Sequence, residues 1–169
     1  MRLGIIARSD NTGLGNQTRE LVKMLNPNKI LLIDSAPFNK NKQHPEWYEE
    51  YDCQPVRGFP RAFEIEHFLK GLDVVLTCET FYNKEFIELA RRKKVKTVLQ
   101  YNYEFLEYLA QPTLALPDVM LAPSLWNFEH VAELFGSKTN VTYLPPPTDH
   151  TLFNAVRENN ISKHHNKIL

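Results

Sequence analysis

Short apolar runs alternate with helix-like stretches along most of this chain, and this alternation constrains the fold more than any other feature. The apolar runs are typical of strands buried on both faces and cover residues 3–7, 30–33, 73–77, 95–99, 119–122 and 141–144. Helical spacing of apolar residues covers residues 18–25, 62–70, 84–92, 103–109 and 125–135. Steady alternation of this kind indicates right-handed βαβ units. We therefore predict an α/β three-layer sandwich with a mostly parallel sheet of about six strands, with residues 3–7 and 73–77 at its centre.

Two segments depart from this pattern. Residues 35–60 contain four prolines and a polar run, which predicts a long excursion with one weak strand at most. Excursions of this length in a compact domain are usually functional or mobile. From residue 154 onward the chain is polar, and we expect residues 154–169 to form a polar tail or the start of an interdomain linker.

Charge and cysteine content exclude several classes of function. Twenty basic residues balance twenty acidic ones, so no overall field favours a nucleic acid or an anionic lipid. The basic cluster at 91–94 falls at the end of an expected helix, where cations complement the helix dipole. Cys53 and Cys78 form no metal-binding or disulfide pattern, which favours a reducing compartment. We expect a cytoplasmic protein with no metal, no nucleic-acid partner and no membrane span.

A glycine-rich turn follows the first expected strand, and ligands of open parallel sheets bind at the carboxyl ends of the strands. The turn and the helix start after it supply candidate binding residues: Gly13, Leu14, Gly15, Asn16 and Gln17. We expect Gly13 and Gly15 to form the turn and to face an open cleft, so that valine at Gly15 blocks ligand approach while the fold stays largely intact. Thr18 stands where a dinucleotide fingerprint needs a third glycine, although Asp34 lies where its ribose-binding acid belongs. The alternative is a purely structural turn with Asn16 as the helix N-cap.

Polar and aromatic residues also follow the later strands. Carboxylate, hydroxyl, phenol and amide groups beside aromatic rings suit a polyhydroxylated ligand, and the candidates are Glu79, Thr80, Tyr82, Tyr101, Ser124, Trp126 and Asn127. Each cluster has a structural alternative. Glu79 could pair with a nearby arginine, and Ser124 is also a good N-cap for the helix that follows it.

The order of these clusters resembles the amino-terminal half of GT-B glycosyltransferases, especially the retaining family that includes many bacterial and phage enzymes. The resemblance rests on three segments. Residues 13–21 are the glycine-rich loop and first helix, residues 123–127 surround Ser124, and residues 144–153 are a proline-rich exit segment that leaves the first domain. In the exit segment, proline and threonine replace the glycine and valine of the family pattern. The resemblance implies a Rossmann-like amino-terminal domain over residues 1–153.

By this resemblance the chain is the acceptor-side half of an enzyme that transfers a sugar from a nucleotide-sugar to an unknown acceptor. Residues 13–17 would contact donor phosphate or acceptor, and the residues from Glu79 to Asn127 named above would line the acceptor cleft. A second Rossmann-like domain or chain would be a partner, and we expect the acceptor-side half to be inactive without it. The nucleotide-sugar is a co-substrate, no other cofactor is implied, and no catalytic residue is assigned. Two alternatives stay open: a non-catalytic nucleotide- or sugar-binding module, and an NAD-dependent oxidoreductase domain.

Overall fold

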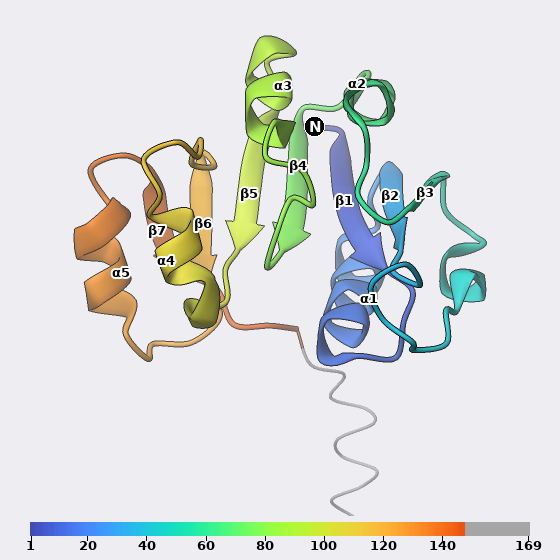
Figure 1. Ribbon diagram of the computed structural model, residues 1–169, viewed down its shortest axis with the longest axis horizontal. Coiled ribbons are helices and arrows are strands. Elements are labelled where there is room, and N and C mark those ends of the chain that lie inside the picture. Colours follow the sequence, from blue (N-terminus) through green and yellow to red (C-terminus); the bar gives the residue numbers. More distant parts are fainter. Residues whose placement is uncertain (148–169) are drawn as a thin grey trace, which may run out of the picture.

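The computed structural model describes residues 1–147, which form one sheet covered by helices (Figure 1). The strands are β1 (Leu3–Arg8), β2 (Lys29–Asp34), β3 (Cys53–Arg57), β4 (Val74–Cys78), β5 (Lys96–Gln100), β6 (Val119–Ala122) and β7 (Asn140–Tyr143). The helices are α1 (Gly13–Leu25), α2 (Ala62–Leu69), α3 (Phe86–Arg92), α4 (Leu106–Leu109) and α5 (Phe128–Phe135), with short 3₁₀ turns η1 (Pro45–Tyr48) and η2 (Tyr103–Phe105).

The seven strands are all parallel and lie in the order β3-β2-β1-β4-β5-β6-β7. This confirms the predicted α/β sandwich, and β1 and β4 lie at its centre as expected. The chain runs outward from β1 in one direction and from β4 in the other. The strand order therefore reverses between β1 and β4, as in Rossmann-like folds, and ligands of such sheets bind at this reversal.

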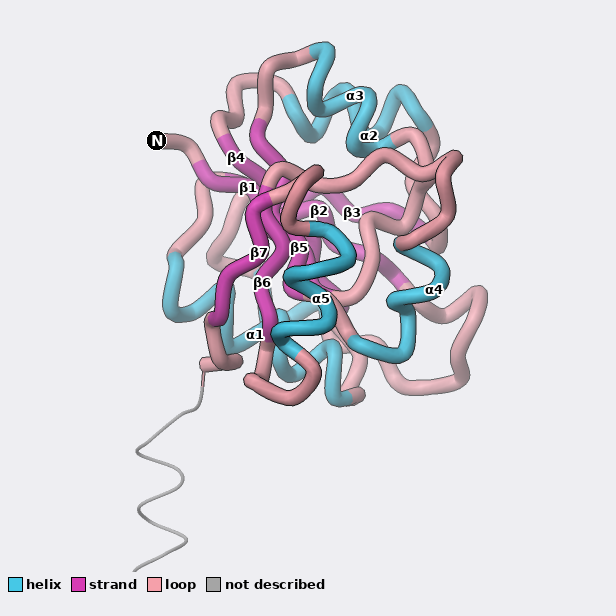
Figure 2. The backbone as a smooth tube through the Cα atoms, turned by 90° about the vertical axis from the view of Figure 1, so that its left-hand side faces the viewer, coloured by secondary structure: helices cyan, strands magenta, loops and turns pink. Residues whose placement is uncertain are grey.

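Two hydrophobic cores form because successive strand residues point to opposite faces of the sheet. Ile5 and Ala7 of β1 pack with Leu21 and Val22 of α1 on one face. Ile6, from the same strand, belongs to the core that α2, α3 and α5 cover on the other face. Figure 2 shows helices on both sides of the strands, which completes the three layers.

The structure confirms one local prediction and changes two others. The weak strand expected within residues 35–60 is β3, an edge strand that carries Pro55. The first helix begins at Gly13 with Thr12 as its N-cap, so the alternative in which Asn16 is the cap was wrong. The last helix begins at Phe128 after Asn127, and Ser124 therefore does not cap it.

The expected domain end at residue 153 and the expected tail at 154–169 lie outside the described residues. Within residues 1–147, no helix is long and apolar enough to cross a membrane. The basic cluster at 91–94 does close helix α3, and Arg91 there pairs with Glu88 and donates to the carbonyl of Leu116.

Candidate functional site

The candidate site lies at the carboxyl ends of β1 and β4, where the strand order reverses. Two loops meet there: residues 9–12, which lead into α1, and residues 79–85, which lead into α3. Several predicted site residues belong to these two loops or to the first turns of α1.

Gly15 is a packing residue rather than the wall of an open cleft. It is buried, and a Cβ atom built on it would lie 1.9 Å from the backbone oxygen of Asp10. Its backbone N–H donates to the Thr12 hydroxyl at 3.1 Å, which closes the first turn of α1. The expectation that valine at Gly15 leaves the fold largely intact was therefore wrong, because any side chain there collides with the backbone of Asp10. Gly13 is exposed, and a Cβ atom on it would meet nothing within 4 Å.

The other residues of the glycine-rich segment point in different directions. Asn16 is exposed, and its side-chain amide donates to the Asn11 side chain at 3.1 Å. Gln17 reaches across the sheet edge and donates to the side-chain oxygen of Gln100, at the end of β5. Gln100 is buried, and its own amide donates to the carbonyl of Leu144. These two side-chain hydrogen bonds connect α1 to the segment that follows β7.

A buried ion pair that the sequence analysis missed lies beneath the start of α1. Asp10 is fully buried and accepts hydrogen bonds from Arg8 (Nε at 3.0 Å and also Nη2), from the hydroxyls of Thr12 and Ser35, and from Asn39 at 2.8 Å. Burial alone would raise the pKa of the Asp10 carboxyl, but these hydrogen bonds outweigh it and hold the pKa at about 2. Burial likewise opposes the charge of Arg8, and the bonds to Asp10 nonetheless raise the pKa of Arg8.

The loop after β4 has an unusual backbone. Glu79 and Tyr82 both adopt positive φ values, 67° and 59°, which non-glycine residues rarely do. Hydrogen bonds hold this shape: the Thr77 hydroxyl donates to the carbonyl of Thr80 at 2.7 Å, and the Thr80 hydroxyl accepts from the backbone N–H of Tyr82 at 3.1 Å. Strained backbone that the surroundings hold in place is common at functional sites.

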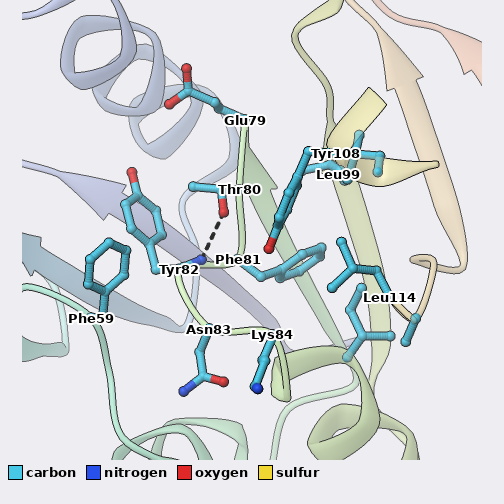
Figure 3. Close-up of a pocket in the computed structure, with 13 residues that line it drawn as sticks. Phe59, Glu79, Thr80, Phe81, Tyr82, Asn83, Lys84, Leu99, Tyr108 and Leu114 are labelled. Carbon is cyan, nitrogen blue, oxygen red and sulfur yellow. Dashed lines mark hydrogen bonds between the residues drawn. The ribbon is translucent and has the colours of Figure 1, made fainter. Parts of the chain in front are cut away.

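This loop forms one wall of a cavity of about 280 Å³, shown in Figure 3. The cavity is lined by Phe59, Glu79, Thr80, Phe81, Tyr82, Asn83, Lys84, Ile87, Leu99, Tyr108, Leu109, Leu114 and Ala115. Phe81, Ile87 and Leu99 are buried members of the core, so the interior of the cavity is apolar. Its charged residues are Glu79 and Lys84, at opposite ends in Figure 3.

Glu79 connects this cavity to the strand reversal. Its carboxylate accepts a hydrogen bond from the side chain of Asn102 at 3.2 Å, and the positive charge of Arg8 acts on it. Burial raises the pKa of the Glu79 carboxyl and outweighs both of these effects. Burial also raises the pKa of the Tyr82 hydroxyl, against the opposing charge of Arg8.

The structure brings together only some of the predicted cleft residues. Glu79, Thr80 and Tyr82 share the cavity, but Tyr101 is 2% exposed and lies in the core. Ser124 and Trp126 are exposed on the loop after β6, where Trp126 packs edge-on against Tyr103 with ring centroids 4.7 Å apart. Asn127 borders a separate depression beside α5. Tyr82, like Tyr101, is buried, whereas Trp126 is 67% exposed, so the aromatic residues of the predicted cleft do not share one surface.

Asp34, the expected ribose-binding acid of the dinucleotide alternative, ends β2 and is half-buried. Its carboxylate accepts from the backbone N–H of Ala36 at 2.9 Å. One sequence signal could have found the missed pair: Arg8 and Asp10 are two charges directly at the end of a buried strand.

Comparisons with known proteins identify no family. No protein-family model matches the chain, and no curated protein matches it. One similar solved structure is an alpha-glucosyltransferase in complex with UDP-glucose and DNA containing an abasic site, with 14% identity over 88% of this chain and a TM-score of 0.48. Another is a wide-type short-chain dehydrogenase/reductase from Veillonella parvula DSM 2008 in complex with NADP, with 12% identity over 84% of this chain and a TM-score of 0.43. The chain spans 43% of the length of the first and 66% of the second. Both likenesses concern the Rossmann-like fold, which the strand order already shows.

Proposed function

We propose that this chain is the acceptor-side half of a glycosyltransferase that uses a nucleotide-sugar donor. The observation that carries the proposal is the position of Glu79, which lines the cavity and also lies within reach of the Arg8 charge at the strand reversal. A hydroxyl-bearing acceptor in the cavity would therefore present a hydroxyl at the place where Rossmann-like folds bind their ligands. The resemblance of residues 13–21 and 123–127 to GT-B enzymes supports the same function.

The groups at this end of the cavity suit recognition of a hydroxyl. The Glu79 carboxylate accepts a hydrogen bond from an acceptor hydroxyl, and Asn102 fixes its orientation. The Thr80 hydroxyl accepts from the backbone of Tyr82, which leaves its own proton free to donate. The protein thus positions the hydroxyl that attacks the donor sugar, which is the main task of an acceptor site.

The start of α1 fits the acceptor better than the donor phosphate. A free helix N-terminus attracts phosphate, because its unpaired N–H groups and the helix dipole favour negative charge. Here the ionised Asp10 already lies beneath the first turn of α1, and the Thr12 hydroxyl accepts a hydrogen bond from the N–H of Gly15. A phosphate would meet a nearby negative charge. We therefore assign residues 13–17 to the acceptor side of the cleft, and the donor to a second Rossmann-like domain on this or another polypeptide.

The 169-residue chain alone is expected to show little or no sugar transfer. Stabilising the departing phosphate requires groups on both walls of a closed cleft, and one open wall leaves that charge in water. The measurement is nucleoside diphosphate release from UDP-glucose, UDP-N-acetylglucosamine and GDP-mannose with mixed hydroxyl acceptors. A longer chain that includes the downstream reading frame serves as the comparison. Robust sugar transfer by the 169 residues alone would contradict the proposal that the donor binds to a second domain.

Glu79→Gln in the longer, transferring chain is expected to lower acceptor-stimulated nucleoside diphosphate release by about tenfold, the effect of losing a hydrogen bond to a charged group. Acceptor-independent hydrolysis of the donor should not change. Because the raised pKa of Glu79 leaves more of it protonated in mild acid, the parent's rate should rise as the pH rises through that pKa. Glu133→Gln, at an exposed position on α5, is the matched control. If Glu79→Gln leaves the acceptor-stimulated rate unchanged, Glu79 is not part of the acceptor site.

An NAD-dependent oxidoreductase is the second candidate, because the strand order and the position of Asp34 at the end of β2 suit a dinucleotide. Asp10 beneath the start of α1 argues against it, since the pyrophosphate of a dinucleotide binds at that turn. Titration with NADH, followed by its fluorescence, separates the two. Saturable NADH binding that Asp34→Asn weakens strongly would favour the oxidoreductase.

A further inference from the structure

The cavity beside the loop after β4 has an apolar middle between two oppositely charged ends. Figure 3 places Phe81 and Leu114 between Glu79 at one end and Lys84 at the other. Leu99, which also lines the cavity, is fully buried. A ligand that fills this cavity therefore needs an apolar body with polar groups at both of its ends.

Lys84 is available to a ligand. Its side chain is exposed at the rim, and it forms no ion pair with any residue from 1 to 147. The neighbouring Asn83 is already committed, because its amide donates to the carbonyl of Pro60 and its oxygen accepts from the backbone of Glu85. Tyr108 adds a phenol to the cavity wall, with its hydroxyl directed toward Phe81 in Figure 3.

The size and lining of the cavity favour an aromatic ring over a sugar ring. A cavity of about 150 Å³ lined by apolar side chains holds one benzene molecule, and this cavity measures about 280 Å³. One substituted aromatic ring therefore fits. A sugar ring would bring several hydroxyls against Phe81, Leu99 and Leu114, where each hydroxyl without a hydrogen-bond partner is costly.

We propose that the acceptor bound here is a small hydroxylated aromatic acid, with its ring between Phe81 and Leu114, its hydroxyl at Glu79 and its carboxylate at Lys84. This assignment rests on the proposed sugar transfer for the role of the hydroxyl, and on the cavity alone for the shape and charge of the ligand. The carboxylate meets the ammonium group of Lys84 at the solvent-exposed rim. The hydroxyl lies at the buried end, next to the strand reversal where the donor sugar would arrive.

The test is binding of 4-hydroxybenzoate and of its methyl ester to the 169-residue chain, measured by ligand-observed and protein-observed NMR titration. The acid should bind more tightly than the ester. Lys84→Met should weaken binding of the acid by about fivefold, the effect of an exposed ion pair, and should remove the preference over the ester. Lys93→Met, an exposed lysine at the end of α3, is the matched control and should change neither affinity.

A second variant tests the cavity itself. Ala115→Trp places a large ring in the cavity and should abolish binding of acid and ester alike, while thermal unfolding shows whether the variant is still folded. Equal affinity for acid and ester in the parent, or no binding of 4-hydroxybenzoate by the folded parent, would overturn the proposal.

The experiments distinguish a failure of this acceptor proposal from a failure of the proposed glycosyltransferase function. If the longer chain transfers sugar to saccharide acceptors while 4-hydroxybenzoate does not bind, the acceptor assignment fails and the glycosyltransferase stands. If 4-hydroxybenzoate binds in a Lys84-dependent way but no nucleotide-sugar is consumed, the cavity assignment stands and the transferase function fails.

Discussion

Gly15→Ala is expected to destabilise the domain by about 3 kcal/mol or more, at the upper end of what overpacking usually costs. The added methyl group would lie 1.9 Å from the carbonyl oxygen of Asp10. That atom is backbone, so it cannot rotate away as a flexible side chain would. Helix α1 must instead move away from β1, which disturbs the contacts of Leu21 and Val22 in the core. Thermal unfolding should show a midpoint roughly 6–12 °C lower for a domain of this size.

Gly13→Ala is the matched control, because it is the same substitution two residues earlier. A Cβ atom at Gly13 meets nothing within 4 Å. Alanine also favours helix more than glycine does, so this variant should have the stability of the parent or exceed it by up to about 1 kcal/mol. Equal stabilities of the two variants would show that α1 does not pack against Asp10 as described.

The fold was predictable because its signal is local. The strands at 3–7 and 73–77 are continuous apolar runs, and β1 and β4 are central and buried as expected. Strand β3 gave only a weak signal, because an edge strand needs few apolar residues and tolerates Pro55. We predicted the start of α5 at residue 125, because Ser124 is a good N-cap, but the helix begins at Phe128. Asn127, the residue before it, has a left-handed backbone conformation that the sequence pattern does not reveal.

The candidate site was harder to predict because it depends on contacts between distant segments. Asp10 is buried only because Ser35 and Asn39, about 25 and 29 residues later, supply donors to it. Leu114 reaches the cavity from a connection that carries no motif, between α4 and β6. Strand-end position did predict that Glu79 and Thr80 lie together, and both line the cavity, because parallel strands end at one edge of the sheet. The same argument failed for Tyr101, which turns into the core instead of toward solvent.

Asp10→Ala is expected to cost about 3–5 kcal/mol of stability, the effect of removing one partner of a buried ion pair. The substitution leaves the guanidinium of Arg8 without its carboxylate and leaves Ser35 and Asn39 without their acceptor. Urea unfolding, followed by tryptophan fluorescence, gives the difference. Arg8→Met should cost clearly less, since Asp10 would still accept from Thr12, Ser35 and Asn39. If Asp10→Ala were as stable as the parent, the buried network would not hold the ends of β1 and β2 together.

The dependence of this difference on pH tests whether Asp10 is charged in the folded protein. Its pKa of about 2 lies below the ordinary value of 3.8, so the folded state binds its proton less readily than the unfolded state does. The ionised carboxylate therefore contributes about 2 kcal/mol at pH values above 4, and this contribution is lost as the pH falls from about 4 to 2. Other carboxyl groups titrate in the parent and in Asp10→Ala alike, so the difference between the two isolates Asp10. The stability gap should narrow by about 2 kcal/mol across that interval. A gap that stays constant would mean that folding leaves the pKa of Asp10 unshifted, and a gap that widens as the pH falls would mean that the folded protein holds Asp10 protonated.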